Sequence, residues 1–352
     1  MKTIKLGKVK INEETDPYII AEIGVNHECS LLKAKKLILK AKQGGANAAK
    51  FQTYKAELIT SKKSPSYWDI KKEKTKSQFK LFKKYDHFNK SDYVELYKYC
   101  KSLNIDFAST PFDHEAVDML DPLVSYFKIS SSDITNFPLL KKIASKKKLV
   151  LLSTGASNLI EIKNAFNFLK KHKCQNIVIM HCILNYPTKD EDANLGMIQH
   201  LKEYFPNNII GYSDHTLPNS EMTNMYTSYI LGARILEKHF TLNKKLKGND
   251  HYHSMDFTDL KNLKKRLTSA KKIIGLRKKK CLQSELNSKK YARRSLVLKN
   301  NLENKSIIKT ENIICKRPGT GISPIYLQKV IGKKIKKNLS EDHILKWSDI
   351  LR

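Results

Sequence analysis

Short apolar runs alternate with amphipathic segments eight times along the chain, and this alternation constrains the fold more than any other feature. Each run has the length and composition of a buried strand, and the intervening segments have apolar residues at helical spacing. The strand-like runs lie at residues 18–27, 48–54, 105–112, 126–133, 149–157, 177–187, 209–216 and 233–240. Eight strand–helix units predict an α/β fold in which a parallel sheet closes into a (β/α)8 TIM barrel. An open, doubly wound sheet is the alternative, but no Gly-x-Gly-x-x-Gly motif follows the first strand.

The composition changes after the eighth unit. We expect a barrel domain over residues 1–275, a lysine-rich linker over 276–291 and a small domain over 292–352. The last segment has short β-like pieces separated by Gly and Pro. At about 60 residues it is only marginally stable alone, so we expect it to dock on another surface.

The chain is strongly basic, with 66 Lys and Arg against 34 Asp and Glu, a formal charge of +32. A nucleic-acid partner would explain this balance. Only seven of the basic residues are arginine, however, and the lysines are spread along the whole chain. We therefore interpret the charge as a lysine-rich surface, without a specific nucleic-acid partner, whose field attracts anionic substrates.

Two further features indicate a cytoplasmic protein without a membrane partner. No stretch approaches the length of a membrane span, and the first residues lack the apolar run of a signal peptide. The six cysteines form no Cys-x-x-Cys pair, a distribution that favours reduced thiols over disulfides or a zinc ribbon.

Every predicted strand ends in polar residues. In a TIM barrel the carboxyl ends of all strands face one mouth, where active sites lie. A single polar strand end is commonly structural, but eight of them at one mouth are difficult to explain by packing. We therefore expect an enzyme.

The same strand ends predict an anion site. Lys50 and Lys128 would supply two positive charges at inward-facing strand ends. Short neutral donors would come from Thr110, Ser131, Ser153, Asn185 and Ser213. Such a set suits a phosphate together with a carboxylate. No Walker-type loop is present, so a nucleotide site of that kind is not expected.

Two histidines at neighbouring strand ends predict a metal site. His215 and His239 end strands seven and eight, which lie about 5 Å apart in a sheet. They could share one ion and leave its other positions to water and substrate. Glu237 points the same way as His239 in a strand and is interpreted as a ligand or as a group that orients one.

The loop GNDHYHSMD contains two more histidines, His251 and His253, in a His-x-His pattern. Loop histidines without a rigid frame are weaker ligands, so we expect neither to hold the metal. We interpret Asp250 as an acceptor for a substrate hydroxyl. An ordinary Asx turn after Gly248–Asn249 is equally consistent with the sequence.

The stretches AEIGVNHE, AKFQTY, FKISSSDITNFPLL, LSTGAS, GYSDHT, LEKHFTL and KRPGTGIS resemble the sialic acid synthase family, which includes the legionaminic and pseudaminic acid synthases. The resemblance covers nearly the whole chain. It implies a TIM barrel with a small C-terminal antifreeze-like (SAF) domain. It also implies an enzyme that condenses phosphoenolpyruvate with an N-acetylated hexosamine, such as N-acetylmannosamine or a 2,4-diacetamido sugar, and releases phosphate.

The resemblance also implies roles for individual residues. His215 and His239 align with ligands of a divalent metal, Mn²⁺ in the first instance, with Mg²⁺ or Co²⁺ as alternatives. Phosphoenolpyruvate would be held by Lys50, Gln52, Thr110, Lys128, Ser131, Ser153, Asn185 and Ser213. Tyr186, Asp133 and Asp250 fall on sugar-contacting positions, and Arg317 on an arginine that the small domain inserts into the partner's mouth in a domain-swapped homodimer.

Two departures from the family pattern leave the identity of the sugar substrate undetermined. The segment Ser130–Asp133 stands where sialic acid synthases typically have Gly-Ser-Gly-Glu. The sugar-facing carboxylate, that of Asp133, is therefore one methylene shorter than the usual glutamate. The loop that begins SPSYWD lacks the usual Pro-Gly-Asn. The sequence also does not determine which carboxylate transfers the proton of the attacking water; the candidates are Glu22, Glu237 and Asp250. A metal-dependent phosphoesterase on the same barrel and a non-enzymatic polyanion-binding protein remain rival hypotheses.

Overall fold

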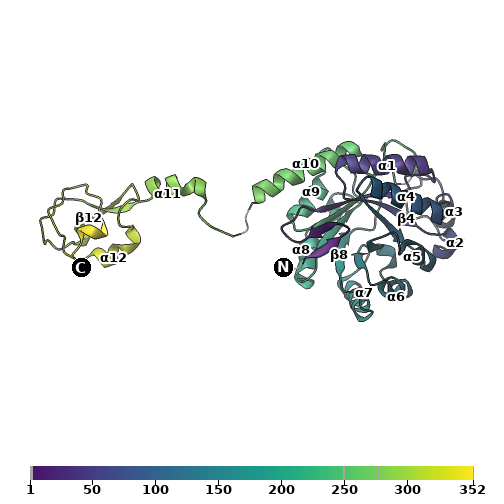
Figure 1. Ribbon diagram of the computed structural model, residues 1–352, viewed down its shortest axis with the longest axis horizontal. Helices are drawn as coiled ribbons and strands as arrows, with labels where there is room; N and C mark the ends of the chain where they lie inside the picture. Colours follow the sequence, from purple (N-terminus) through teal and green to yellow (C-terminus); the bar gives the residue numbers. More distant parts are fainter. Residues whose placement is uncertain (1–2, 249, 276–277, 352) are drawn as a thin grey trace. The chain divides into compact units, whose positions relative to one another are not determined.

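A computed structural model describes residues 3–248, 250–275 and 278–351 of the chain (Figure 1). It divides the chain into two compact units, Met1–Ile274 and Gly275–Arg352. Asn249, expected in a turn, and residues 276–277 of the expected linker lie outside the described residues. No helix in the described ranges combines the length and apolar character needed to cross a membrane.

The first unit is a nearly closed barrel of parallel strands, as the alternation predicts. Its strands are β3 (Tyr18–Gly24), β4 (Ala48–Thr53), β5 (Asp106–Pro111), β6 (Tyr126–Ile129), β7 (Leu149–Ser153), β8 (Ile177–Cys182), β9 (Ile210–Asp214) and β10 (Ile235–His239). They pair in the order β5-β4-β3-β10-β9-β8-β7-β6. The strands at the two ends of this order, β5 and β6, lie beside each other and bring the barrel close to closure.

Helices connect the strands and surround the barrel (Figure 1). The main ones are α1 (Leu31–Gly44), α4 (Lys90–Ser102), α5 (His114–Leu120), α6 (Phe137–Ser145), α7 (Leu159–Lys171), α8 (Met197–Tyr204), α9 (Thr223–Ile230) and α10 (Phe257–Ile274). Two short helices, α2 (Ala56–Ile59) and α3 (Gln78–Lys83), lie in the long connection between β4 and α4. Local signals set the ends of these helices. In α1, for example, the Ser30 side chain accepts from the Lys33 amide, and Gly45 ends the helix with a left-handed φ of 97°.

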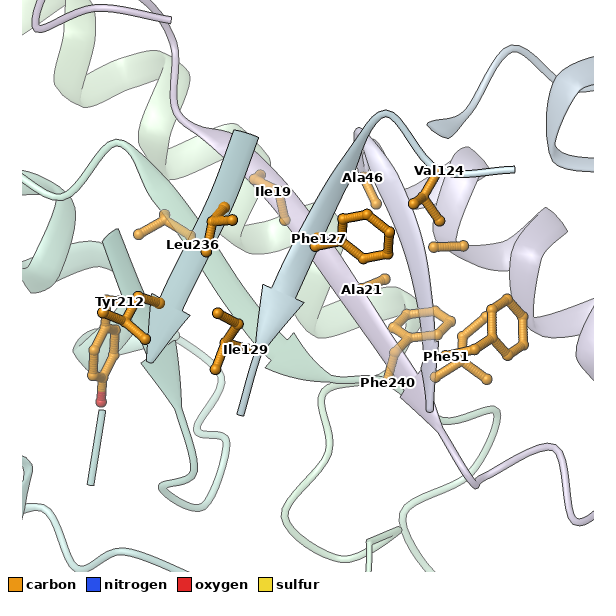
Figure 2. Close-up of a cluster of buried hydrophobic side chains, with 14 of the residues drawn as sticks. Ile19, Ala21, Ala46, Phe51, Val124, Phe127, Ile129, Tyr212, Leu236 and Phe240 are labelled. Carbon is orange, nitrogen blue, oxygen red and sulfur yellow. The ribbon is translucent and has the colours of Figure 1, made fainter. Parts of the chain in front are cut away.

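Side chains alternate between two faces of the barrel strands, and each face has its own core. Outward residues such as Ile19, Phe51 and Phe127 pack against the helices in a large apolar layer (Figure 2). Inward residues such as Tyr18 and Ile20 fill the amino-terminal half of the barrel.

A hairpin of β1 (Ile4–Leu6) and β2 (Val9–Ile11) packs its buried residues into this inner core and closes the amino-terminal end of the barrel. The inward positions at the opposite, carboxyl ends are polar, and they form the candidate site.

The second unit has a core of its own. Strands β11 (Ser295–Leu298) and β12 (Ile313–Lys316) pair antiparallel. They pack with Ile308, Ile322, Val330, Ile335 and other apolar residues of this unit. A short helix, α12 (Leu327–Val330), belongs to the same unit. Part of the segment expected as a linker is helical, because α11 spans Leu286–Ala292.

The interior of the barrel is packed closely enough to give a test of the fold. A Cβ on Gly211, in β9, would lie 2.9 Å from the Ile235 carbonyl oxygen and would overlap the Met180 side chain. We expect Gly211→Ala to lower the free energy of unfolding by roughly 1–3 kcal/mol, as overpacked cores do. Gly196→Ala is the matched control, because nothing lies within 4 Å of its Cβ position. Urea unfolding followed by circular dichroism compares the two, and equal stability would contradict the packing described here.

Candidate active site

The inward residues at the carboxyl ends of the strands line a small polar recess. Strand register brings them together, since Glu22 on β3 stands beside Lys50 on β4 and beside His239 on β10. Glu237 on β10 stands beside Ser213 on β9. The recess is lined by Glu22, Lys50, Gln52, Thr110, Phe112, Lys128, Ser130, Ser131, Ser153, Cys182, Tyr186, Ser213, His215, Glu237 and His239.

Two lysines and two glutamates form a buried charge network in this recess. Lys50 Nζ lies 2.6 Å from Glu22 Oε2 and 3.6 Å from Glu237 Oε1. Lys128 Nζ lies 3.0 Å from the same Glu237 oxygen. Lys50 also donates to Thr110 Oγ1 at 2.9 Å. At most 6% of any of these four side chains is exposed, so each charge depends on the others for stabilisation.

Two members of the network, Glu237 and Lys50, are held in their charged forms. Burial raises the pKa of Glu237 when taken alone, but Lys128 and Lys50 outweigh it and lower that pKa to about 2. Burial opposes the charge on Lys50, yet Glu22 and Glu237 raise the pKa of its ammonium. Burial also raises the pKa of Glu22, although Lys50 opposes this shift. Glu22 is therefore the carboxylate of the pair that protonates more readily.

Several polar atoms of the recess remain available to a ligand. Ser153 Oγ and Glu237 Oε2 are buried and have no hydrogen-bond partner among the described residues. Ser131 Oγ accepts from the Gly155 amide at 2.9 Å, which fixes that hydroxyl at the mouth. Asn185, expected in the same cradle, is not among the described residues that line the recess, and Arg317 belongs to the second unit.

Histidines gather at one side of the recess. The ring centroids of His215 and His239 are 5.7 Å apart, and those of His239 and His253 are 4.9 Å apart. His239 Nδ1 lies 3.3 Å from Asp250 Oδ2. Burial opposes the charge on His239, but Asp250 raises the pKa of its imidazole. His215 is oriented by a 2.7 Å contact between its Nδ1 and the Ile183 carbonyl oxygen.

Three residues of this cluster, His239, Asp250 and His253 but not the expected ligand His215, have donor atoms close enough together to hold a divalent metal. One ligand atom each from His239, Asp250 and His253 lies within 4.8 Å of the other two. Imidazole nitrogens with a carboxylate oxygen suit first-row divalent ions. His253 is fully buried, and neither of its ring nitrogens has a hydrogen-bond partner in the described part of the chain. Burial and His239 lower its pKa, so the ring is neutral, the form that binds metal.

The two histidines of the loop differ, which the sequence analysis did not foresee. His251 lies outside the donor group, and both of its ring nitrogens have partners. Its Nδ1 is 2.8 Å from Thr241 Oγ1, and its Nε2 is 3.0 Å from Glu28 Oε1. His253, in contrast, lies against His239. Cys182 was also missed, although its inward position two residues after Met180 could have indicated it.

A cavity of about 570 Å³ adjoins the recess and shares Gln52, Phe112, Ser130, Tyr186 and His239 with it. This volume is typical of small-molecule sites. Aromatic and apolar side chains supply much of its wall, namely Tyr54, Leu58, Ile59, Tyr67, Trp68, Leu81, Phe82, Tyr85, Phe112 and Leu184. Its acidic groups are Glu28, Asp133 and Asp250, and no lysine or arginine is among the described residues that line it. Burial raises the pKa of Asp133.

A second buried ion pair lies on the outward face of the same strands. Lys238 Nζ is 2.7 Å from Asp214 Oδ2 and donates to the Thr216 carbonyl oxygen at 2.7 Å. The side chains of Lys238 and Asp214 are 0% and 2% exposed. Asp214 also accepts from Tyr212 and from the Thr216 amide and hydroxyl. Lys238 and Asp214 directly precede His239 and His215, so the pair ties together the two strands that carry these histidines.

Comparison with known proteins places the chain in a family. The model of the NeuB family matches residues 37–279, and the SAF domain model matches residues 293–351. An N,N'-diacetyllegionaminic acid synthase from Campylobacter jejuni is 40% identical over 333 residues, with 93% of this chain and 98% of the relative covered. The human N-acetylneuraminate-9-phosphate synthase is 31% identical, with 92% and 90% covered.

A solved structure agrees with this assignment. The N-acetylneuraminic acid synthetase of Leptospira borgpetersenii, in complex with citrate, superimposes with a TM-score of 0.72 at 34% identity, over 82% of this chain and 95% of that one. The fold and the comparisons thus define a barrel synthase with a SAF domain. The chain belongs to the NeuB family. Its relatives include proteins named as legionaminic acid, pseudaminic acid and N-acetylneuraminate-9-phosphate synthases, and the family resemblance seen in the sequence is confirmed.

The Lys238–Asp214 pair gives a test of how the histidine strands are held. We expect Lys238→Met to lower the free energy of unfolding by roughly 3–5 kcal/mol, because it leaves a buried carboxylate without its cation. The double variant Lys238→Met/Asp214→Asn should recover a large part of this loss, since it removes the orphaned charge. Urea unfolding of the three proteins measures both effects. A single variant as stable as the unmodified protein would show that the pair is not needed.

Proposed function

We propose that this enzyme condenses phosphoenolpyruvate with an unphosphorylated, N-acetylated amino sugar and releases inorganic phosphate. The observation that carries the proposal is the convergence of Lys50 and Lys128 in a buried polar recess that opens into the 570 Å³ cavity beside the histidines. The recess has the charges and hydroxyls for a phosphate and a carboxylate. The cavity has the size and mixed wall for an acylated sugar.

In the proposed reaction, the methylene carbon of phosphoenolpyruvate forms a bond to the aldehyde carbon of the open-chain sugar. Water then adds to the oxocarbenium-like carbon, and the carbon–oxygen bond to phosphate breaks. Lys50, Lys128, Thr110, Ser131, Ser153 and Ser213 would hold the phosphate and carboxylate in place, with Gln52 and Asn185 as further members of the cradle. This positioning sets the methylene carbon against the aldehyde.

A divalent metal held by His215 and His239 would supply Lewis-acid polarisation of the aldehyde oxygen, with Mn²⁺ proposed and Mg²⁺ or Co²⁺ as alternatives. Among the three candidate carboxylates, we propose that Glu22 accepts the proton of the attacking water. Glu22 stands between His239 and Lys50 in the strand register, and thus between the aldehyde and the anion. Glu237 is held by both lysines and would instead maintain their positions.

The wall of the cavity supports the choice of an unphosphorylated sugar. A phosphate on the sugar would need a cation, and among the described lining residues the charged groups are acidic. Tyr186, Asp133 and Asp250 are proposed to contact the sugar. The relatives include enzymes named for a 9-phosphate product and others named for diacetylated products, so this chain would follow the second group.

Three further parts of the proposal rest on the sequence composition and on the family resemblance. We propose a cytoplasmic enzyme and a domain-swapped homodimer in which Arg317 reaches the partner's site. We also propose that the basic surface serves to attract anionic substrate and does not bind a specific nucleic acid.

A phosphate-release assay tests the proposed function. With phosphoenolpyruvate and Mn²⁺, we expect phosphate release and a condensed product by mass spectrometry with N-acetylmannosamine or a 2,4-diacetamido hexose. We expect little with N-acetylmannosamine 6-phosphate, because its phosphate would meet an acidic wall. Release without any sugar would favour a phosphoesterase. No release with any sugar, combined with tight binding of polyanions, would favour a binding protein.

The role of the lysines is tested separately. Lys128→Ala should raise the KM for phosphoenolpyruvate by the equivalent of roughly 3–5 kcal/mol while changing the KM for the sugar much less, because a substrate charge is left unpaired in a buried site. Lys189→Ala is the matched control, since that lysine is 73% exposed. Steady-state kinetics with each substrate varied in turn gives both constants. An unchanged response to phosphoenolpyruvate would remove Lys128 from the cradle.

A further inference from the structure

His253, in the loop after β10, is placed beside the proposed metal site in a way that its neighbour His251 is not. We infer that His253 is a ligand of the divalent metal, together with His239 and Asp250. This chain would then surround the ion with more of its own donor atoms than the two histidines at the strand ends provide. The inference rests on the metal dependence proposed above.

The first argument is the unmet hydrogen-bonding capacity of His253. Its side chain is 0% exposed, and both Nδ1 and Nε2 lack hydrogen-bond partners among the described residues. Buried polar atoms without partners are rare in folded proteins and each requires an explanation. A metal ion satisfies a ring nitrogen without a hydrogen bond, and it restores the stabilisation that burial removed.

The second argument is convergence. A ring nitrogen of His253 lies within 4.8 Å of ligand atoms on both His239 and Asp250, and the three atoms form one group. His239 Nδ1 lies 3.3 Å from Asp250 Oδ2. Three donors of the type that transition metals prefer therefore lie close enough together to share one ion. The ring of Tyr186 lies 5.5 Å from that of His253 and closes the site on one side.

The third argument is the contrast within the His-x-His pair. His251 is nearly as buried as His253, at 3% exposure, but Thr241 and Glu28 satisfy both of its ring nitrogens. Burial in this loop therefore does not by itself leave a histidine without partners. The loop backbone is also fixed close to the strand end, because the Met255 amide donates to the His239 carbonyl oxygen at 2.8 Å. His253 is thus held on a frame attached to β10, which a ligand requires.

The inference changes the role of Asp250. As a metal ligand, its carboxylate would link the ion to the wall of the sugar cavity, which it also lines. Metal binding would therefore connect the loop to the strand ends and stabilise the folded chain by mass action.

Metal titration of the purified full chain, stripped of metal, tests the inference. Mn²⁺ binding is measured by calorimetry, and Co²⁺ binding by its visible d–d spectrum, with no substrate present. We expect His253→Ala to weaken Mn²⁺ binding by at least about tenfold, the loss seen even for groups that only orient a ligand. The Co²⁺ spectrum should change as well. His251→Ala is the matched control and should stay within about threefold of the unmodified protein, because it removes no donor.

Two further variants separate failure of this inference from failure of the proposed function. His239→Ala should lose metal under either assignment. If it does, while His253→Ala binds Mn²⁺ normally with an unchanged Co²⁺ spectrum, the His253 assignment is wrong and the proposed function stands. If the unmodified protein binds neither ion, the proposed metal dependence itself fails. Should His253→Ala lose its circular dichroism signal, His253→Gln replaces it. Pulsed electron paramagnetic resonance of the Mn²⁺-loaded proteins should then show one coordinated imidazole nitrogen fewer in His253→Gln than in the unmodified protein, and an equal number would overturn the inference.

Discussion

The buried network of Lys50, Lys128, Glu22 and Glu237 is the interaction on which the rest of the site depends. Four ionised groups in a dry interior are tolerated only when each faces an opposite charge. Four barrel strands, β3, β4, β6 and β10, contribute one group each, and Glu237 on β10 faces both lysines. The two positive and two negative charges cancel, so this network alone does not attract a multiply charged anion. A divalent ion at the neighbouring histidines would give the region the net positive charge that phosphoenolpyruvate requires.

Much of this arrangement could be predicted from the sequence, because the period of a strand is fixed. Once the strands are identified, Lys50, Ser213 and Glu237 must point inward and their neighbours outward, as the structure has them. The alternation of apolar runs and helices likewise predicted the barrel. The same reasoning treats Lys238 as an outward residue, but it does not reveal the buried partner that Asp214 provides.

The loop after β10 shows where such reasoning ends. Nothing in the period of a strand distinguishes His251 from His253, which differ only in the path of the backbone between Thr241 and Met255. That path is fixed by tertiary pairing, including the bridge between Phe240 and Met255. Sequence alone favoured treating both histidines alike. The structure separates them into one that is fully hydrogen-bonded and one that faces the metal donors.

The hairpin of β1 and β2 has a consequence for the order of events at the site. Because its apolar residues close the amino-terminal end of the barrel, the opening that the described residues give the recess is at the carboxyl ends of the strands, where the recess adjoins the 570 Å³ cavity. The two compartments share five lining residues, among them Gln52, Tyr186 and His239, and a sugar seated against these residues would stand in the path to the lysines. We therefore expect compulsory-order kinetics, in which phosphoenolpyruvate enters before the sugar and the condensed sugar leaves before phosphate.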